Sequence, residues 1–177
     1  MSNSPESLNE SALAGGPPAG HGEEHPPPRD PARLAALAAA SLVDTPMEEA
    51  FDRLTRLAAG FLDAPVALVN VVDDRKQFSK SCFVPPDWRG AAEAPLADSL
   101  CKWAVIEREP VAIPDARLDR RVSDSTMVSE LGIVCYLGVP LILSGGAALG
   151  TLCLAGFEPR EWTEREVAVL SDLAALV

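Results

Sequence analysis

The strongest constraint on the fold of this chain is an apolar stretch from Val134 to Gly156, VCYLGVPLILSGGAALGTLCLAG. It predicts two β-strands joined by a Ser-Gly-Gly turn at 144–146, because consecutive glycines supply the positive φ angles of a tight hairpin. Both strands are apolar at nearly every position, so protein should cover both faces of the hairpin. Helices should cover one face, and a loop lid or a pocket on the other face is where function should lie.

The composition predicts one folded domain behind a tail. The 177 residues are 47% apolar and 23% charged, which is enough for one packed core. Residues 1–28 are rich in Pro, Gly and Glu and carry both histidines of the chain. Such a segment offers too few core side chains to offset chain entropy, so we expect a disordered tail at 1–28 and a domain at 31–177. A solvated tail also explains the two histidines better than a metal site does.

Charge and segment lengths exclude several classes of partner. The net charge of −11 opposes a phosphate backbone, so nucleic-acid binding is not expected. No apolar run is long enough to span a bilayer, and the amino terminus lacks the pattern of a secretory signal. The four cysteines show no CxxC spacing. We therefore expect reduced thiols and a cytoplasmic location, with no membrane partner.

Apolar periodicity and capping signals predict the other elements. The expected helices follow Pro31, a capping box at 45–48, Asp98-Ser99 and a capping box at 163–166, and they span 31–42, 46–62, 100–108 and 163–177. The further expected strands span 65–72, 77–84 and 111–113, with a loop from 85 to about 96 and one or two helical turns near 126–131. Strands that follow one another as hairpins predict an antiparallel sheet with segregated helices, which is the α+β class.

The folded region lacks the usual catalytic constellations. Residues 31–177 contain no histidine, which removes histidine-dependent nucleophiles and histidine metal ligands. No GxSxG, GxGxxG or GxxxxGK[ST] motif occurs. The carboxylate pairs Asp73/Asp74 and Asp115/Asp119 are better explained by turn formation and solvated ion pairing. We therefore expect no catalytic residues and no metal site.

Cys101 is the cysteine best placed for reactivity. It falls in the first turn of a predicted helix, where the helix dipole can lower a thiol pKa. Its apolar neighbours indicate a turn that faces the core, so a structural thiol is the preferred interpretation. A redox site formed by Cys82 and Cys101 is the alternative. Cys135 and Cys153 lie within apolar strands, where a cysteine is a small hydrophobe, and Cys153 is expected to be structural.

The ordered motifs of residues 33–177 resemble the GAF family of small-molecule-sensing domains. They are LVDTPMEEAFDRLTRLAAGFL, PVALVNVVDDRKQFSKS, DSLCKWAV, EPVAIPDARLDRR, GIVCYLGVPLI, ALGTLCLAG and PREWTEREVAVLSDLA. Each motif is weak by itself, whereas their order is specific. The chain is most similar to the subtype found beside histidine kinases, nucleotide cyclases and serine phosphatases in bacterial signalling proteins.

This resemblance implies a GAF/PAS-like architecture. A central antiparallel sheet would carry the terminal helices on one face and a pocket on the other, roofed by residues 85–108 and 114–132. The implied ligand-binding candidates are Phe78, Cys101, Trp103, Asp115, Arg121 and Tyr136. The resemblance also implies a homodimer through the helices at 31–42 and 163–177, and an output partner such as a kinase, cyclase or phosphatase.

The ligand stays open at this point. Bilin-binding and haem-binding relatives use a pocket histidine, which 31–177 lack, so neither cofactor is expected. The leading hypothesis is a non-catalytic sensory domain that binds a small molecule or a partner and signals through its terminal helices. One alternative is a thiol redox enzyme or sensor similar to free methionine sulfoxide reductases. Another is a degenerate domain kept for dimerisation, and the chain is expected to be a stand-alone regulator or a fragment of a receptor.

Overall fold

The computed structural model describes residues 29–40, 49–88, 90 and 92–176. Within these residues the helices are α1 (Pro31–Ala39), α2 (Glu49–Leu62), α3 (Cys101–Glu107), α4 (Thr126–Ser129) and α5 (Glu164–Ala174). The strands are β1 (Val66–Val72), β2 (Lys76–Phe83), β3 (Glu93–Pro95), β4 (Val111–Ile113), β5 (Cys135–Ile142) and β6 (Ala148–Gly156). The predicted tail at 1–28 lies outside the described residues.

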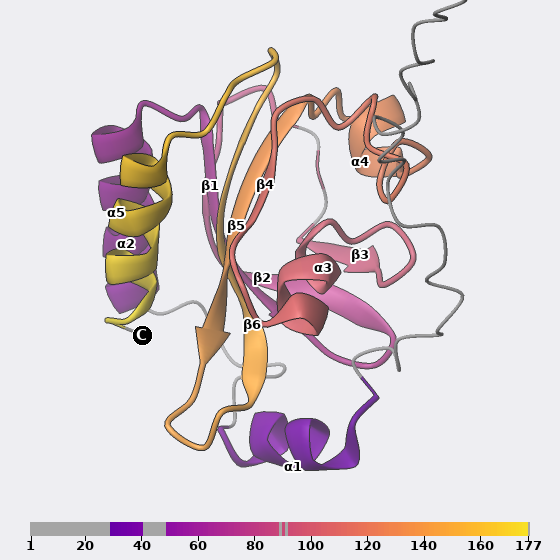
Figure 1. The fold of residues 1–177 in the computed structure, drawn as a ribbon, viewed down its shortest axis with the longest axis vertical. Coiled ribbons are helices and arrows are strands. Elements are labelled where there is room, and N and C mark those ends of the chain that lie inside the picture. Colours follow the sequence, from indigo (N-terminus) through magenta and orange to yellow (C-terminus); the bar gives the residue numbers. More distant parts are fainter. Residues whose placement is uncertain (1–28, 41–48, 89, 91, 177) are drawn as a thin grey trace, which may run out of the picture.

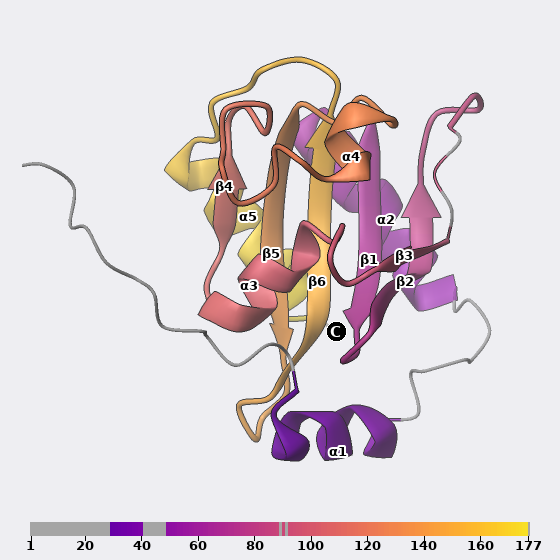
Figure 2. The same cartoon turned by 90° about the vertical axis from the view of Figure 1, so that its right-hand side faces the viewer.

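The six strands form one antiparallel sheet in the order β3-β2-β1-β6-β5-β4. Helices α2 and α5 lie side by side on one face, whereas α3, α4 and long loops cover the other (Figure 1). Figure 2 views the sheet from the α3 side, with α1 across one end. The predicted α+β class is confirmed. None of the described helices is long and apolar enough to cross a bilayer.

The predicted hairpin is formed by β5 and β6. In its turn, Gly146 has a φ of +83°, which is the left-handed conformation expected of a glycine there. Every residue of β6 is buried, and so is every residue of β5 except Ile142. Because β6 pairs with both β1 and β5, the hairpin occupies the middle of the sheet and is covered on both faces.

Capping explains where several helices begin. The Asp30 side chain accepts a hydrogen bond from the Ala32 N–H at 2.9 Å, directly before Pro31. Thr163 and Glu166 form the predicted reciprocal capping box of α5. The hydroxyl of Ser99 accepts from the Lys102 N–H at 3.1 Å in the first turn of α3. The other predicted box, at 45–48, lies outside the described residues.

Buried Arg33 fixes α1 to the end of the sheet. Its Nη1 donates to the carbonyl oxygens of Val72 at 2.8 Å and Ala148 at 3.2 Å, so α1 is tied to β1 and β6 at once. Leu37 of α1 packs beside these strands with Phe78 and Leu149. As a result, α1 lies apart from α5, although the family resemblance implied that both helices form one dimer interface.

One strand differs from the sequence prediction. Residues 93–95, expected within a loop, form β3 and pair with Lys76–Phe78 of β2. This edge strand is three residues long and ends in Pro95. Such a segment is too short to show the alternation that identifies a strand, and an edge position tolerates proline.

The packing of β1 on β6 predicts the effect of a single methyl group. A Cβ at Gly150 would lie 1.9 Å from the backbone oxygen of Asn70, whereas one at Gly60 of α2 would meet nothing within 4 Å. We expect Gly150→Ala to lower the free energy of unfolding by at least about 2 kcal/mol. The matched variant Gly60→Ala should raise it by about 0.5–1 kcal/mol, because alanine favours helix. Urea unfolding measures both, and equal midpoints for Gly150→Ala and wild type would contradict this packing.

Candidate functional site

A small pocket lies between α3 and the face of the sheet opposite α2 and α5. Its volume is about 40 Å³, enough for only a few water-sized groups. Its apolar walls come from β1, β6 and the surrounding loops, namely Val66, Leu68, Trp88, Leu100, Met127, Ile133 and Ala155. Its polar lining consists of Asn70, Gln77, Cys101, Tyr136 and Cys153. The partial exposure of Leu68, Trp88 and Met127 places the mouth of the pocket beside them.

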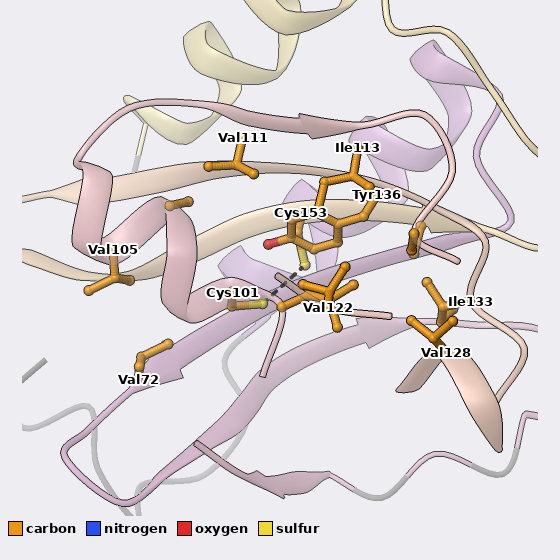
Figure 3. Packing of buried hydrophobic residues seen from close by; sticks show 14 of the residues in the cluster. Val72, Cys101, Val105, Val111, Ile113, Val122, Val128, Ile133, Tyr136 and Cys153 are labelled. Atoms are coloured by element: carbon orange, nitrogen blue, oxygen red, sulfur yellow. Dashed lines mark hydrogen bonds between the residues drawn. The ribbon is translucent and has the colours of Figure 1, made fainter. Parts of the chain in front are cut away.

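Two cysteines meet in the wall of this pocket. The Sγ atoms of Cys101, at the start of α3, and Cys153, in β6, lie 3.8 Å apart (Figure 3). The amide Nδ2 of Asn70 donates to Cys101 Sγ at 3.2 Å and lies 3.7 Å from Cys153 Sγ. Ser79 donates to Asn70 Oδ1 at 2.6 Å and thereby orients the amide. We call Asn70, Cys101 and Cys153 the dithiol cluster.

Two buried hydroxyls beside the cluster have no hydrogen-bond partner among the described residues, those of Tyr136 and Thr151. A partner is normal for a buried hydroxyl, so such atoms mark a place for a water or for a polar atom of a ligand. Tyr136 lies along β5, where a Cβ at Gly138 would come within 2.1 Å of its oxygen. The absence of a side chain at Gly138 therefore leaves room for the phenol against the sheet.

The surroundings favour a thiolate on Cys101. A hydrogen bond from Cys153 lowers the pKa of Cys101 to about 6; burial opposes this shift, and the hydrogen bond from Asn70 reinforces it. The pKa of Cys153 is raised well above its usual value, first by its hydrogen bond to Cys101 and then by burial. The pair therefore loses one proton easily and holds the second tightly. Burial likewise raises the pKa of Tyr136, so its hydroxyl stays protonated.

The structure places Cys101 and Tyr136 in the pocket wall, among the six predicted candidates. Trp103 lies two residues further along α3 and packs against the same apolar cluster without lining the pocket. Its ring is flanked by Lys102 Nζ, 5.5 Å from the ring centroid, and by the Arg121 guanidinium carbon at 5.9 Å. Trp103 is thus a neighbour of the pocket and not part of its wall.

Phe78 lies on the opposite face of β2 from the pocket. It pairs with Val71 and packs with Leu37 of α1, whereas its neighbour Gln77 lines the pocket. Side chains alternate between the two faces of a strand, so a shift of one residue reverses the face. The sequence prediction placed Phe78 on the pocket face, where Gln77 lies instead. An irregularity in the β1–β2 register between Val69 and Asn70 adds to the difficulty.

Asp115 and Arg121 form ion pairs within the loop after β4, away from the pocket wall. Arg117 Nη2 lies 2.6 Å from Asp115 Oδ2, and its hydrogen bonds hold the Asp115 pKa below the ordinary value. Arg121 pairs with Asp119 at 2.7 Å and with Glu107 at 3.1 Å. These contacts fit the solvated ion pairing that the sequence predicts for this loop.

The structure gives Cys101 a different sulfur neighbour from the one predicted. Cys82 is exposed on β2, whereas Cys153, expected to be purely structural, lies against Cys101. Strand register contains the missed signal, because Tyr136 and Cys153 occupy the same face of the hairpin. Asn70 was missed as well, although a lone polar residue within the apolar strand VALVNVV is a signal for a buried polar site.

No group of three or more His, Cys, Asp or Glu side chains suited to a metal ion occurs within the described residues. The dithiol cluster offers two sulfurs and one amide nitrogen, and the amide is donating. The chemistry that it supports is therefore that of a close pair of thiols in a small, mainly apolar pocket.

Comparison with known proteins places these features in a family. The GAF domain family matches residues 46–177. A cyclic di-GMP phosphodiesterase of Pseudomonas aeruginosa, PA2567, is 32% identical over 153 residues, which is 85% of this chain and 25% of that protein. The Escherichia coli diguanylate cyclase DgcP is 38% identical over 81 residues, covering 45% of this chain and 22% of that protein. The chain thus spans about a quarter of the length of these relatives.

Solved structures with this fold have diverse functions. A far-red cyanobacteriochrome photoreceptor matches with a TM-score of 0.61 and 11% identity, over 81% of this chain and 90% of that one. A free methionine-R-sulfoxide reductase of Neisseria meningitidis matches with a TM-score of 0.59 and 14% identity, over 81% and 82%. At such identities the likeness shows the fold alone. The family match and the sheet architecture together establish that this chain belongs to the GAF domain family.

Proposed function

We propose that this GAF domain is a non-catalytic sensory unit of a cyclic-di-GMP signalling protein, and that the pocket beneath α3 binds a small uncharged molecule. The two relatives named above, a phosphodiesterase and a cyclase, support the signalling context. The observation that carries the ligand proposal is the pair of buried, unpartnered hydroxyls of Tyr136 and Thr151 beside an apolar pocket.

Size and charge restrict the ligand. The pocket of about 40 Å³ has no Lys, Arg, Asp or Glu among its described lining residues. An anionic group placed there would lose its hydration and would face the negative charge favoured on Cys101, with no Lys or Arg to offset it. Cyclic di-GMP itself is far too large and too charged for this site. The domain is therefore proposed to act upstream of that nucleotide, as a regulator.

The sheet provides a route from the pocket to the helices. Tyr136 and Cys153 face the pocket, whereas the alternate residues Leu137 and Leu154 face α2 and α5. A ligand that moves β5 or β6 therefore acts directly on strands against which Leu170 of α5 packs. This arrangement supports signalling through the helical face, and an output partner such as a cyclase or phosphodiesterase belongs to the same proposal.

The helical face also supports a homodimer, with a second copy of this chain as its partner. Leu57 and Phe61 of α2 are exposed on one side of the helix, and Leu176 lies exposed just after α5. Phe61 and Val169 line one groove at these helices, together with Leu62 and four charged residues. Exposed apolar groups gathered in this way are typical of an interface. The interface is therefore proposed at α2 and α5, in place of the pairing of α1 with α5 implied by the family resemblance.

Replacing a small lining residue by a larger one should fill the pocket and abolish ligand binding. Ala155 lines the pocket and Ala112 is exposed on β4, so Ala155→Leu fills the site and Ala112→Leu is a matched control. In a thermal-shift screen of small uncharged metabolites, we expect at least one to raise the Tm of wild type and Ala112→Leu by roughly 5–10 °C at a hundredfold excess over Kd. It should leave Ala155→Leu unchanged. Stabilisation by no compound, or equal stabilisation of Ala155→Leu, would argue against a sensory pocket.

A charge in the proposed interface should separate the dimer. Phe61 is 68% exposed on α2, and Leu118, at 80% exposed in the loop after β4, is a comparable apolar residue elsewhere. Light scattering coupled to gel filtration should give a dimer for wild type and Leu118→Glu and a monomer for Phe61→Glu, because a buried unpaired carboxylate is unfavourable. A monomeric wild type at micromolar concentration would refute the proposed interface.

A further inference from the structure

We propose that Cys101 and Cys153 form a reversible disulfide when a small hydroperoxide enters the pocket, which makes the dithiol cluster a peroxide-responsive site. This inference rests on the proposed sensory function and names a chemical class for its signal. The sulfurs lie 3.8 Å apart, so they must approach by about 1.75 Å to reach the disulfide bond length of about 2.05 Å. The cysteines are 52 residues apart in sequence, so only the fold brings them together.

The pocket selects the oxidant. Both cysteines are 2% exposed, so a protein thiol or a bulky disulfide cannot reach either sulfur for exchange. A small neutral peroxide fits a pocket of about 40 Å³ with largely apolar walls. The hydroxyl of Tyr136 lines the pocket and that of Thr151 lies beside the cluster. Neither has a partner among the described residues, so both are open to hydrogen bonds with the peroxide oxygens. The lowered pKa of Cys101 supplies the thiolate, which is the nucleophilic form of a cysteine.

The reaction balances when a hydroperoxide is the oxidant. The Cys101 thiolate attacks the terminal peroxide oxygen and the O–O bond breaks, which leaves a sulfenic acid on Cys101 once protons are taken up from water. The second oxygen departs as water or an alcohol. The Cys153 sulfur then attacks the sulfenic sulfur, loses its proton and expels water, which forms the disulfide. Overall, the two thiols lose two electrons and two protons, and the hydroperoxide takes up these electrons and protons as its O–O bond breaks.

The geometry assigns different roles to the two cysteines. Asn70 Nδ2 is nearer to Cys101, at 3.2 Å, than to Cys153, at 3.7 Å, so the amide stabilises negative charge chiefly on Cys101. Cys101 is therefore the residue that attacks the peroxide, and Cys153 is the residue that resolves the sulfenic acid. Cys82 and Cys135 take no part: Cys82 is exposed on β2, and burial raises the pKa of the Cys135 thiol.

Peptide mapping after oxidation tests the proposal. The folded chain is treated with hydrogen peroxide and then unfolded, unreacted thiols are alkylated, and the disulfides are identified by mass spectrometry. Of the four cysteines, we expect Cys101 and Cys153 to become linked and to return to thiols with dithiothreitol. Cys82→Ser should behave as wild type. Cys153→Ser should instead accumulate a sulfenic acid at Cys101, detected by mass spectrometry as one added oxygen atom on the peptide that contains this residue.

Several outcomes would overturn the proposal. If the chain is treated with peroxide while folded and still yields four thiols when alkylated after unfolding, the proposal is contradicted. A disulfide that includes Cys82 would also contradict it. A bulky aryl hydroperoxide should react at least about tenfold more slowly than hydrogen peroxide, and equal rates would mean that the pocket does not select the oxidant. The metabolite screen on wild type separates this proposal from the sensory function. A metabolite that raises the Tm of a wild-type chain whose four thiols all survive peroxide treatment refutes the peroxide response and leaves the pocket proposal intact.

Discussion

The close approach of β1 to β6 is the constraint on which the rest of the structure depends. Gly150 permits it, because any larger residue would place a carbon atom against the carbonyl of Asn70. With β1 on one side and β5 on the other, β6 is buried along its entire length. Both faces of the sheet centre must therefore be covered, and the two coverings are chemically different.

Against β6 the covering is apolar on one face, and on the other it includes polar groups. Leu152 and Leu154 pack beneath α2 and α5 in a continuous hydrophobic cluster. The alternate residues of the same strand, Thr151 and Cys153, lie beside Asn70 and Cys101. Burial makes polar and titratable groups sensitive to their immediate partners, since water no longer screens them. The dithiol cluster therefore lies on one face of β6, and helices α2 and α5 pack against the opposite face of the same strand.

The sequence predicted the elements whose signals are local. The Gly-Gly turn, the continuous apolar runs of the hairpin and the capping box at Thr163 each act within a few residues, and each appears where expected. Positions that depend on contacts between distant parts of the chain were harder to predict. The position of α1 follows from two hydrogen bonds of Arg33 to distant carbonyls, and no local pattern encodes them.

The candidate site shows the same difference between local signals, which the sequence reveals, and long-range contacts, which it does not. Cys101 was identified because its helix start is a local feature, whereas Cys153 is 52 residues away and only the register of β6 brings it close. Phe78 was misassigned by a single step of strand alternation, which reverses the face of a side chain. Asn70 was overlooked although it is polar within an apolar strand, and it is fully buried at the centre of the cluster.

Titration of the thiols by ultraviolet absorbance tests most directly whether these buried groups are coupled. The account predicts that wild type gains one thiolate near pH 6, that Cys101→Ser loses this step, and that Cys153→Ser retains it because a hydroxyl also donates a hydrogen bond. Cys153→Ala should shift the step to higher pH, since the principal donor is gone. A wild-type chain whose first thiolate appears only at the ordinary cysteine pKa of about 8.5 would contradict the account.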